Sequence, residues 1–269
     1  MTDHLLRNHA PITDAGWEAI EADVKPRLAA QLAARKLVDF EGPLGWAHSA
    51  ANLGRTNPIE GQSSDVTASL RAVLPLVEVR VDFALRRAAL DDVERGARDV
   101  DLSALADAAR HLALAENQSV FHGYPAAGIT GITEASSHSS IELEADVNRY
   151  PGTVARAVDV LRQNGIGGPY GLAIAPDRYT EIIVTTEHGG YPLLEHLREI
   201  LGGAVVWAPG VSGGVVLSTR GGDFVFECGE DIAIGYASHE TDTVKLYLEE
   251  SYSFRVLEPD AAIALQPAG

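Results

Sequence analysis

The sequence has very little cysteine and few basic residues. Cys228 is the only cysteine among 269 residues, so neither a disulfide within the chain nor a cysteine-based metal cluster can form. Lysine and arginine total 21 against 38 acidic residues, which gives a formal net charge of −17. Phosphate repels so acidic a surface, which excludes nucleic-acid binding through a basic face. The charge favours solubility, and the cysteine content is consistent with the cytoplasm.

Long apolar runs are also missing. No window approaches the roughly 18 apolar residues that span a membrane, so no transmembrane helix is expected. Residues 1–10 lack the apolar core of a secretory signal peptide. Hydrophobic residues nevertheless make up 46% of the chain, which is typical of a globular protein rather than a disordered one. We therefore expect a cytoplasmic globular protein with no membrane or nucleic-acid partner.

Recognisable catalytic and metal-binding motifs are absent as well. The nine histidines form no His-Glu-x-x-His pair or zinc-finger spacing, and there is no Gly-x-Ser-x-Gly elbow or phosphate-binding loop. The glycine-rich segment 165–168 precedes a predicted strand, so it fails the dinucleotide-binding pattern. Ser137 and His138 are neighbours in sequence only, which favours a polar loop over a catalytic pair. We predict no catalytic residue and no metal site.

Adjacent acidic residues do not change that prediction. Examples are Glu230-Asp231, Asp91-Asp92 and Glu249-Glu250. Neighbouring residues on a strand point to opposite faces, so such pairs do not easily converge on one substrate atom. We therefore interpret these acidic pairs as residues of solvated turns and strand edges.

The first 90 residues predict a helix, a polar segment and a long strand. A helix is expected over 14–35, capped by Thr13 or Asp14, with Pro26 breaking or kinking it. Residues 52–69 are polar and turn-rich, which indicates either a mobile surface loop or an arm that becomes ordered on a neighbouring chain. Residues 74–85 alternate apolar and charged side chains, the pattern of a strand. The apolar stripe expected on the helix comprises Trp17, Ile20, Val24, Leu28 and Leu32.

The rest of the chain divides into a spine helix, an alternating lobe and a sheet. Residues 91–99 predict a charged connector, and 102–120 a helix with Asp101 as its cap. Helices and strands alternate from about 132 to 219, which indicates an inserted lobe. Its expected helices cover 153–164, 176–186 and 193–201, and its expected strands 170–175, 205–208 and 214–219. After Arg220, β-branched and aromatic segments alternate with glycine-rich turns, which is typical of a sheet.

Ordered phrases along nearly the whole chain indicate a family. They are APIT at 10–13 with Trp17, RKLVDFEGP at 35–43, LPLVEVR at 74–80, LDDVERG at 90–96, GPY at 168–170, YPL at 191–193 and RGGDF at 220–224. In this order they resemble the encapsulins, the shell proteins of bacterial nanocompartments that were once described as linocin-type bacteriocins. The resemblance implies self-assembly and cargo packaging rather than chemistry in one pocket.

The implied fold is α+β, the fold of the tailed-phage major capsid protein. It has a peripheral domain, an axial domain and an extended loop. The matching division is 1–48 for the N-terminal helix and first part of the peripheral domain, 49–73 for the extended loop, 74–131 for the peripheral domain with the long strand and spine helix, 132–219 for the axial domain, and 220–269 for the rest of the peripheral domain. The implied assembly is an icosahedral homo-oligomer, with 60 copies in a T=1 shell.

The resemblance also implies a cargo site. In this family a short C-terminal targeting peptide on the cargo enzyme docks on the luminal side, between the N-terminal helix and the C-terminal sheet. Dye-decolourising peroxidases and ferritin-like proteins are the common cargoes. The alternative is that the matched residues only pack the helix on the sheet. Those residues are Leu28, Leu32, Arg35, Asp39, Ile234 and Tyr236.

A fivefold pore and a flavin site are the remaining expectations. The loop of Glu187, His188, Gly189, Gly190 and Tyr191 would line the pore. Some relatives stack a flavin on an aromatic residue after the long strand. Here the corresponding segment, 84–90, is ALRRAAL and has no aromatic platform, so no cofactor is predicted.

Two other functions stay open at this point. One is a hydrolase of unknown substrate that uses the segment from Ser136 to Ser139 or the loop around His188. The other is a phage-derived capsid subunit, which would share the fold.

Overall fold

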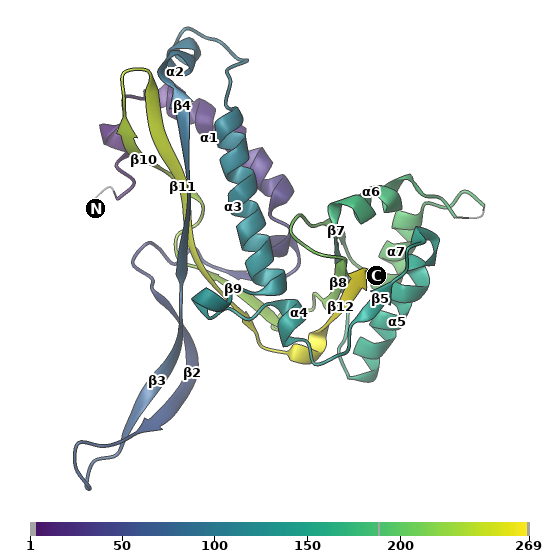
Figure 1. The fold of residues 1–269 in the computed structure, drawn as a ribbon. Helices are drawn as coiled ribbons and strands as arrows, with labels where there is room; N and C mark the ends of the chain where they lie inside the picture. The colour runs from purple at the N-terminus through teal and green to yellow at the C-terminus, as the bar shows by residue number, and fades with distance from the viewer. Residues whose placement is uncertain (1–3, 188, 268–269) are drawn as a thin grey trace.

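The computed structural model describes residues 4–187 and 189–267 as two bodies and a projecting arm (Figure 1). The first body contains the N-terminal helix, the long strands and the spine helix. The second body contains the elements between residues 132 and 218, together with the strand closest to the C-terminus. No helix among the described residues is long and apolar enough to cross a membrane.

The first body is a five-stranded sheet covered by two helices. β11 (Thr243–Val256) pairs along its length with β4 (Val77–Arg86), β10 (Ala233–His239) and β9 (Phe224–Cys228), and β1 (Asp39–Glu41) joins the outer side of β9. The helix α3 (Ser103–His122) packs against β4 and against α1 (Asp14–Gln31). The burial of β4 alternates as its sequence predicts, with Phe83 and Leu85 inside.

The helix α1 is continuous through Pro26, so the expected break into two helices is wrong. Thr13 caps it by accepting a hydrogen bond from the Gly16 amide at 3.2 Å. Pro26 lies on the exposed side of the helix, where solvent can satisfy the carbonyl that loses its amide donor. The predicted apolar stripe is confirmed, since Trp17, Ile20, Val24, Leu28 and Leu32 are all buried.

The connector between β4 and α3 contains a helix that the sequence did not predict. α2 (Arg87–Glu94) covers part of the segment expected to be a charged connector. Its one buried residue, Leu90, provides too little apolar pattern to indicate a helix among so many charges. The spine helix begins one residue later than predicted, and the Asp101 carboxylate accepts a hydrogen bond from the Ser103 amide at 3.0 Å.

The second body is a mixed sheet in the order β5-β12-β8-β6-β7. The helices α5 and α7 pack against each other and against this sheet. The bounds are α4 (Ile132–Ala135), β5 (Ile141–Leu143), α5 (Tyr150–Gln163), β6 (Tyr170–Ile174), α6 (Pro176–Val184), α7 (Leu193–Leu201), β7 (Val205–Trp207), β8 (Gly214–Ser218) and β12 (Ala262–Pro267).

The strand β12 joins the second body. It lies within residues 220–269, the segment expected in the peripheral domain, and it pairs with β8 and β5. Ala262, Ile263 and Leu265 are at most 1% exposed, and this short apolar run fits a fully buried strand. Sequence alone did not show which of the two sheets would accept it.

The arm is a two-stranded hairpin formed by β2 (Ala50–Ile59) and β3 (Ala68–Pro75). The segment predicted as a loop or arm is thus ordered strand, turn and strand, and it extends away from both bodies (Figure 1). The remaining elements are single turns of 3-10 helix, namely η1 (Arg7–His9), η2 (Ala34–Lys36), η3 (Pro125–Ala127), η4 (Val147–Arg149) and η5 (Pro259–Ala261).

Each body has its own apolar core. One core joins α1, α3, β4, β10 and β11 and includes Ile20, Leu105 and Leu246. The other fills the second body and continues into the first through Phe226 and Tyr252, whose rings stack at 5.0 Å. Because that core crosses between the bodies, packing restricts their relative movement.

Candidate functional site: assembly and cargo surfaces

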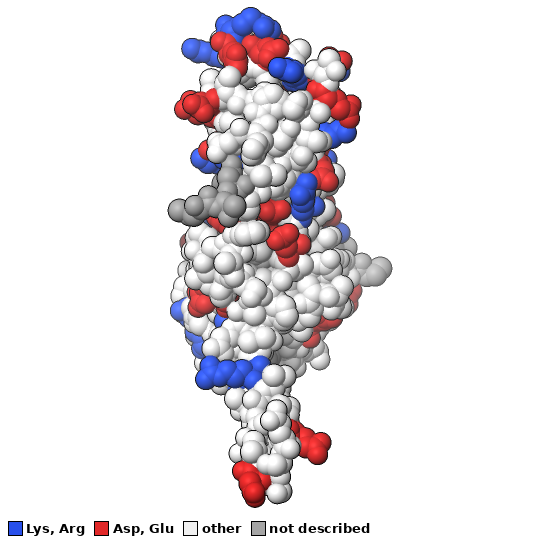
Figure 2. All heavy atoms as spheres, turned by 90° about the vertical axis from the view of Figure 1, so that its left-hand side faces the viewer, with Lys and Arg blue, Asp and Glu red and all other residues white. Residues whose placement is uncertain are grey.

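The arm carries large apolar side chains that the described part of the chain does not cover. Ile59, Val66, Leu70 and Val73 are 50% to 62% exposed. Among residues 4–187 and 189–267, the two strands pair only with each other. Figure 2 shows the arm as a narrow and largely uncharged projection with acidic atoms near its end. Full burial of one such side chain is worth about 1.5–3 kcal/mol, so the arm favours contact with another apolar surface.

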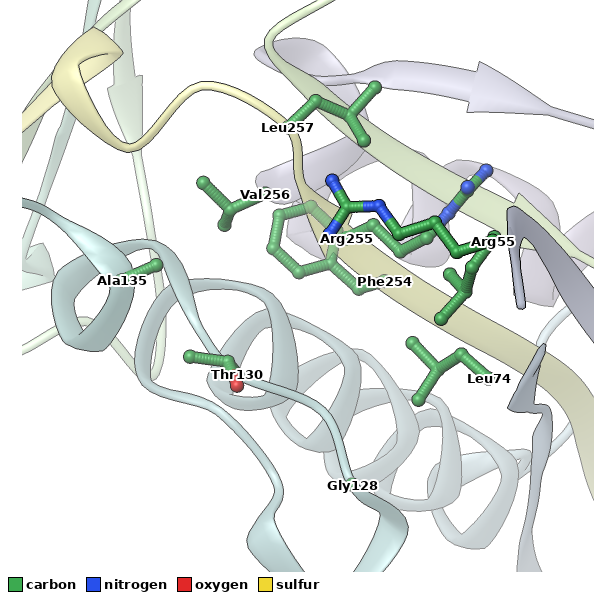
Figure 3. A pocket seen from close by; sticks show the side chains of 10 residues that line it. Arg55, Leu74, Gly128, Thr130, Ala135, Phe254, Arg255, Val256 and Leu257 are labelled. Atoms are coloured by element: carbon green, nitrogen blue, oxygen red, sulfur yellow. The ribbon is translucent and has the colours of Figure 1, made fainter. Parts of the chain in front are cut away.

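A cleft of about 370 Å³ lies where the arm meets the first body. Figure 3 shows Arg55 and Leu74 of the arm on one side, Thr130 and Ala135 on another, and the end of β11 between them. Leu257, at the rim, is 53% exposed. The cleft is therefore partly apolar and open to solvent. Its remaining lining residues are Leu53, Gly128, Phe254, Arg255 and Val256.

Arg255 fixes the base of the arm. Its Nη1 donates to the Asn52 carbonyl at 3.3 Å, and its Nη2 donates to Glu227 Oε2 at 3.1 Å. The other Glu227 oxygen lies 2.8 Å from His48 Nε2. This network joins β2, β9 and β11, so the direction of the arm is set within the chain itself.

The apolar residues predicted to line the cargo groove are buried within the chain. Leu28, Leu32 and Ile234 are 8%, 7% and 5% exposed, and all three belong to the core beneath α1. In the free subunit they pack the helix on the sheet, as the alternative interpretation held. They can therefore form only the floor of a surface site, not its accessible wall.

Arg35 lies beside that layer, already bound to carboxylates of its own chain. Its guanidinium contacts Glu116 at 2.6 Å, Asp231 at 2.6 Å and Glu250 at 2.8 Å. It also lies over the rings of Phe40 and Phe226. The pKa of Arg35 is raised, because these carboxylates outweigh the burial that by itself would lower it. Arg35 thus has an internal role.

The other two predicted cargo residues are more accessible. The Asp39 carboxylate accepts a hydrogen bond from the Gly222 amide at 2.5 Å. The Tyr236 hydroxyl lies 2.5 Å from His239 Nδ1, and its amide donates to the Leu5 carbonyl at 2.8 Å. Both residues are partly exposed. The six predicted residues thus divide into a buried floor, an internal ion cluster and two partly exposed positions.

The loop expected at the fivefold pore is a closed turn between α6 and α7. The Glu187 amide donates to the Tyr191 carbonyl at 2.8 Å, and the Gly190 amide donates to the Glu187 carbonyl at 2.9 Å. Gly189 and Gly190 have φ values of 103° and 82°, which a side chain would strain. His188, the fifth predicted pore residue, lies outside the described residues.

The side chains of this loop carry acidic groups. Glu187 Oε2 lies 2.9 Å from His196 Nδ1. The Tyr191 hydroxyl donates to Glu199 Oε1 at 2.7 Å, and this bond raises the pKa of Tyr191. A ring of symmetric copies would bring several carboxylates together, which is the charge pattern that attracts cations.

The hydrolase alternative lacks a nucleophile and base in contact among the described residues of its segment. The Ser136 hydroxyl donates to the Ala262 carbonyl at 2.7 Å, and His138 Nε2 lies 2.9 Å from the Asp260 carbonyl oxygen. Ser137 bonds to the Asp260 carboxylate. The single thiol is buried in β9, and burial raises the pKa of Cys228 to about 12, so it stays protonated.

The segment after β4 forms a cleft of about 330 Å³, which is the place where a flavin would be expected. Its described lining, which includes Arg86 and Ala88, has no aromatic side chain. The residues do not fit a stacked flavin.

Sequence reasoning missed the buried acidic residues. Glu116 and Glu250 are 0% exposed and Glu249 is 6% exposed, so the assignment of Glu249-Glu250 to solvated turns and edges is wrong. Glu249 and Glu250 were expected to point to opposite faces of the strand. The structure agrees, because Glu250 contacts Arg35 whereas Glu249 does not. A signal was present: Glu116 and Asn117 fall on the apolar face of the helix, in phase with Leu105 and Leu112.

Asn117 has a structural role there. Its side-chain oxygen accepts hydrogen bonds from the amides of Ala33 and Ala34 at 2.9 and 3.1 Å. Its amide nitrogen donates to the carbonyls of Gln31 and Pro209. Asn117 therefore holds the end of α1 against α3 and against the loop that follows β7.

The chain is similar to known shell proteins over its full length. The family described as "Encapsulating protein for peroxidase" matches residues 1–253. A type 1 encapsulin shell protein of Rhodospirillum rubrum is 46% identical over 268 residues, which cover 97% of this chain and 96% of the relative. The type 1 encapsulin shell protein of Mycobacterium tuberculosis is 42% identical over 263 residues, covering 98% and 99%.

Solved structures show the same fold at low sequence identity. A virus-like particle from Pyrococcus furiosus has a TM-score of 0.67 at 18% identity, covering 93% of this chain and 99% of that chain. A protein of Mycobacterium phage Bobi has a TM-score of 0.55 at 13% identity, covering 89% and 91%.

The fold and the projecting arm define a class, the proteins with the α+β fold of tailed-phage capsid proteins. Within that class the curated relatives are named shell proteins rather than enzymes. This chain belongs to the encapsulin shell protein family. The prediction of a structural component and not an enzyme is thereby confirmed.

Proposed function

We propose that this chain builds a closed icosahedral nanocompartment in the cytoplasm, which encloses a cargo enzyme and admits small solutes through pores. The observation that carries the proposal is the arm, whose large apolar side chains are left exposed by the described residues of its own subunit. In a shell, this extended loop adds to the surface of a neighbouring subunit by strand and side-chain contact. The cleft at its base is a suitable acceptor for apolar groups of another copy.

The proposed shell has T=1 symmetry and 60 copies. Sixty copies of a 28.6 kDa chain weigh about 1.7 MDa, so a closed shell is easily distinguished from a monomer or dimer. The first body would be the peripheral domain and the second body the axial domain, which meets its copies at the fivefold axes. The loop at residues 187–191 would then surround the fivefold pore.

The cargo site is proposed at the surface over α1 and β10. Leu28, Leu32 and Ile234 would form its floor, while Asp39 and Tyr236 are partly exposed and available to a peptide. Arg35 would shape the edge through its bound carboxylates. The occupant is the C-terminal targeting peptide of a cargo enzyme, such as a dye-decolourising peroxidase or a ferritin-like protein. The family description, which names a peroxidase, supports the first of these.

Assembly is tested by changing the arm while leaving the bodies unchanged. Leu70 is 62% exposed, so L70D should leave the subunit folded but place a charge where a neighbour buries an apolar group. The matched control is S69D, because the adjacent strand residue faces the other way. We expect megadalton particles for the parent and S69D, and folded small species for L70D, by size-exclusion chromatography with light scattering.

Two results would contradict the proposal. A parent protein that elutes as a folded monomer would exclude the shell itself. Intact hollow particles from L70D would leave the shell in place but show that the arm is not its contact.

A further inference from the structure

Three potential metal ligands meet on the first body, next to Tyr236 and the Arg35 cluster. They are His4 near the chain start, Glu230 in the turn between β9 and β10, and Glu249 in β11. One ligand atom from each lies within 4.8 Å of the other two. The His4 Nε2 and Glu230 Oε1 atoms are 2.6 Å apart, although the two residues are separated by 226 positions in sequence.

Glu249 is a buried acidic side chain on the central strand β11, with Arg80 and His4 as its nearby basic groups. It is 6% exposed, and within the described residues its carboxylate makes no hydrogen bond or ion pair. Its partner across the strands, Arg80, is occupied by Asp82 at 2.8 Å and by the ring of Tyr247. Burial raises the pKa of Glu249, and the charges of Glu78 and Glu230 add to that effect. An unpaired buried carboxylate is costly, so such a position favours a bound cation.

Two contacts hold His4 and the residue after it in place. Its ring stacks on Trp46 with the centroids 4.5 Å apart and the planes at 15°. The next residue, Leu5, accepts a hydrogen bond from the Tyr236 amide at 2.8 Å, which ties the N-terminal segment to β10. An aromatic stack and a backbone bond thus fix the imidazole beside the two carboxylates.

We propose that His4, Glu230 and Glu249 bind one divalent transition-metal ion of the zinc type. Zinc bonds imidazole nitrogen and carboxylate oxygen at about 2.0–2.2 Å in a tetrahedral arrangement, which places any two ligand atoms about 3.4 Å apart. The three atoms are close to that spacing already, and small side-chain rotations complete it. Two carboxylates balance the charge of the ion, and the imidazole selects it over calcium or magnesium.

The ion would link distant parts of the chain. It would join the N-terminal segment to the β9–β10 turn and to the central strand β11. Because three protein ligands leave at least one coordination position free, water would complete the site. The proposal concerns the folded subunit and does not depend on cargo or pores.

The test is a zinc titration of assembled, chelator-treated shells by calorimetry. We expect one Zn²⁺ per chain for the parent, and at least tenfold weaker binding for both E249Q and E230Q. E78Q is the matched control, because it removes a nearby exposed carboxylate that is not a ligand. H9Q controls for exposed histidine near the chain start. Both controls should bind as the parent does.

A second readout uses Co²⁺ in place of Zn²⁺. Trp46 lies against His4, so bound Co²⁺ should quench part of the tryptophan fluorescence in the parent but not in E249Q. If E249Q does not assemble, E230Q supplies the same comparison. Equal Zn²⁺ affinity in the parent and either ligand variant, or loss of binding in H9Q, would overturn the site.

Discussion

Arg35 holds acidic groups from three parts of the chain in one cluster, of which Glu116 and Glu250 are buried and Asp231 is exposed. Glu116 comes from the spine helix, Glu250 from β11 and Asp231 from the turn before β10. Burial raises the pKa of Glu116 and raises that of Glu250 well above its usual value, with Arg35 opposing the shift in both. One guanidinium does not balance the carboxylates around it, and burial makes the fold favour the protonated form of Glu250.

This cluster makes stability depend on pH. A carboxyl group whose pKa is higher in the folded state contributes most below its unfolded value, and the contribution is lost as pH rises through the folded value. Each unit of elevation corresponds to about 1.4 kcal/mol. We therefore predict that E250Q, which mimics the protonated acid, melts at a higher temperature than the parent at pH 8 and at a similar temperature near pH 4.5.

Thermal unfolding of assembled shells across this pH range measures the effect. D107N, at an exposed surface ion pair, is the control and should follow the parent throughout. A constant difference between E250Q and the parent at every pH would show that folding does not raise the pKa of Glu250.

Individual elements were predictable where apolar periodicity was strong. The helix α7 begins and ends where the sequence predicts, because Leu193, Leu197 and Leu201 form one clear face. α2 was missed because charges hide its single buried leucine. The break predicted at Pro26 was wrong because a proline is tolerated where solvent can satisfy the freed carbonyl. The sequence did not show that Pro26 lies on the solvent side of the helix. The polar composition of the arm marked it as unusual, but it did not show that β2 and β3 pair with each other.

The turn at Glu187 to Tyr191 leads to a prediction about transport. Symmetric copies around an axis would place carboxylates near a narrow opening, which raises the local concentration of cations. We predict that ferrous iron enters parent shells fastest, E187Q shells more slowly and E187K shells most slowly. Stopped-flow iron uptake at low ionic strength measures this, provided that assembly is unchanged.

Two controls accompany that experiment: a change in ionic strength, and the same charge change at a position outside the loop. The differences should shrink at high ionic strength, since screening weakens charge effects. D107K changes the same charge on the first body and should leave uptake unchanged. Equal rates for the parent and E187K at low salt would show that this loop does not control cation entry.

At the scale of the whole molecule, the family and fold were predictable but the candidate cargo site was less so. Short matching segments along the chain indicated the family. The periodicity of apolar residues along β4 and α1 predicted which of their side chains lie in the core. The burial of Leu32 and Ile234 depends on how α1 seats on the sheet, which sequence spacing does not specify. The cluster of His4, Glu230 and Glu249 could not be predicted from the sequence either, because these residues become neighbours only through the fold.

Cargo loading is tested at positions that burial leaves accessible. The double variant D39A and Y236A should assemble but retain less than a tenth of the parent's cargo, since both side chains are proposed to contact the targeting peptide. S238A, an exposed change on the same strand, is the control. Cargo and shell are compared by quantitative mass spectrometry of purified particles.

Two outcomes distinguish the site from the core. Cargo at the parent's ratio in the double variant would place the peptide elsewhere. L32D or I234D should instead prevent folding, because each puts a charge into a closed apolar core.

The place of β12 in the second sheet sets an order of events during synthesis. A ribosome releases the chain from the N-terminal end, so β5, β6, β7 and β8 emerge well before residues 262–267. Until then β5 and β8 lack the strand that lies between them, and their open edges cannot pair. A nascent subunit therefore cannot present a finished second body to its neighbours. The second sheet is complete only after residues 262–267 have left the ribosome.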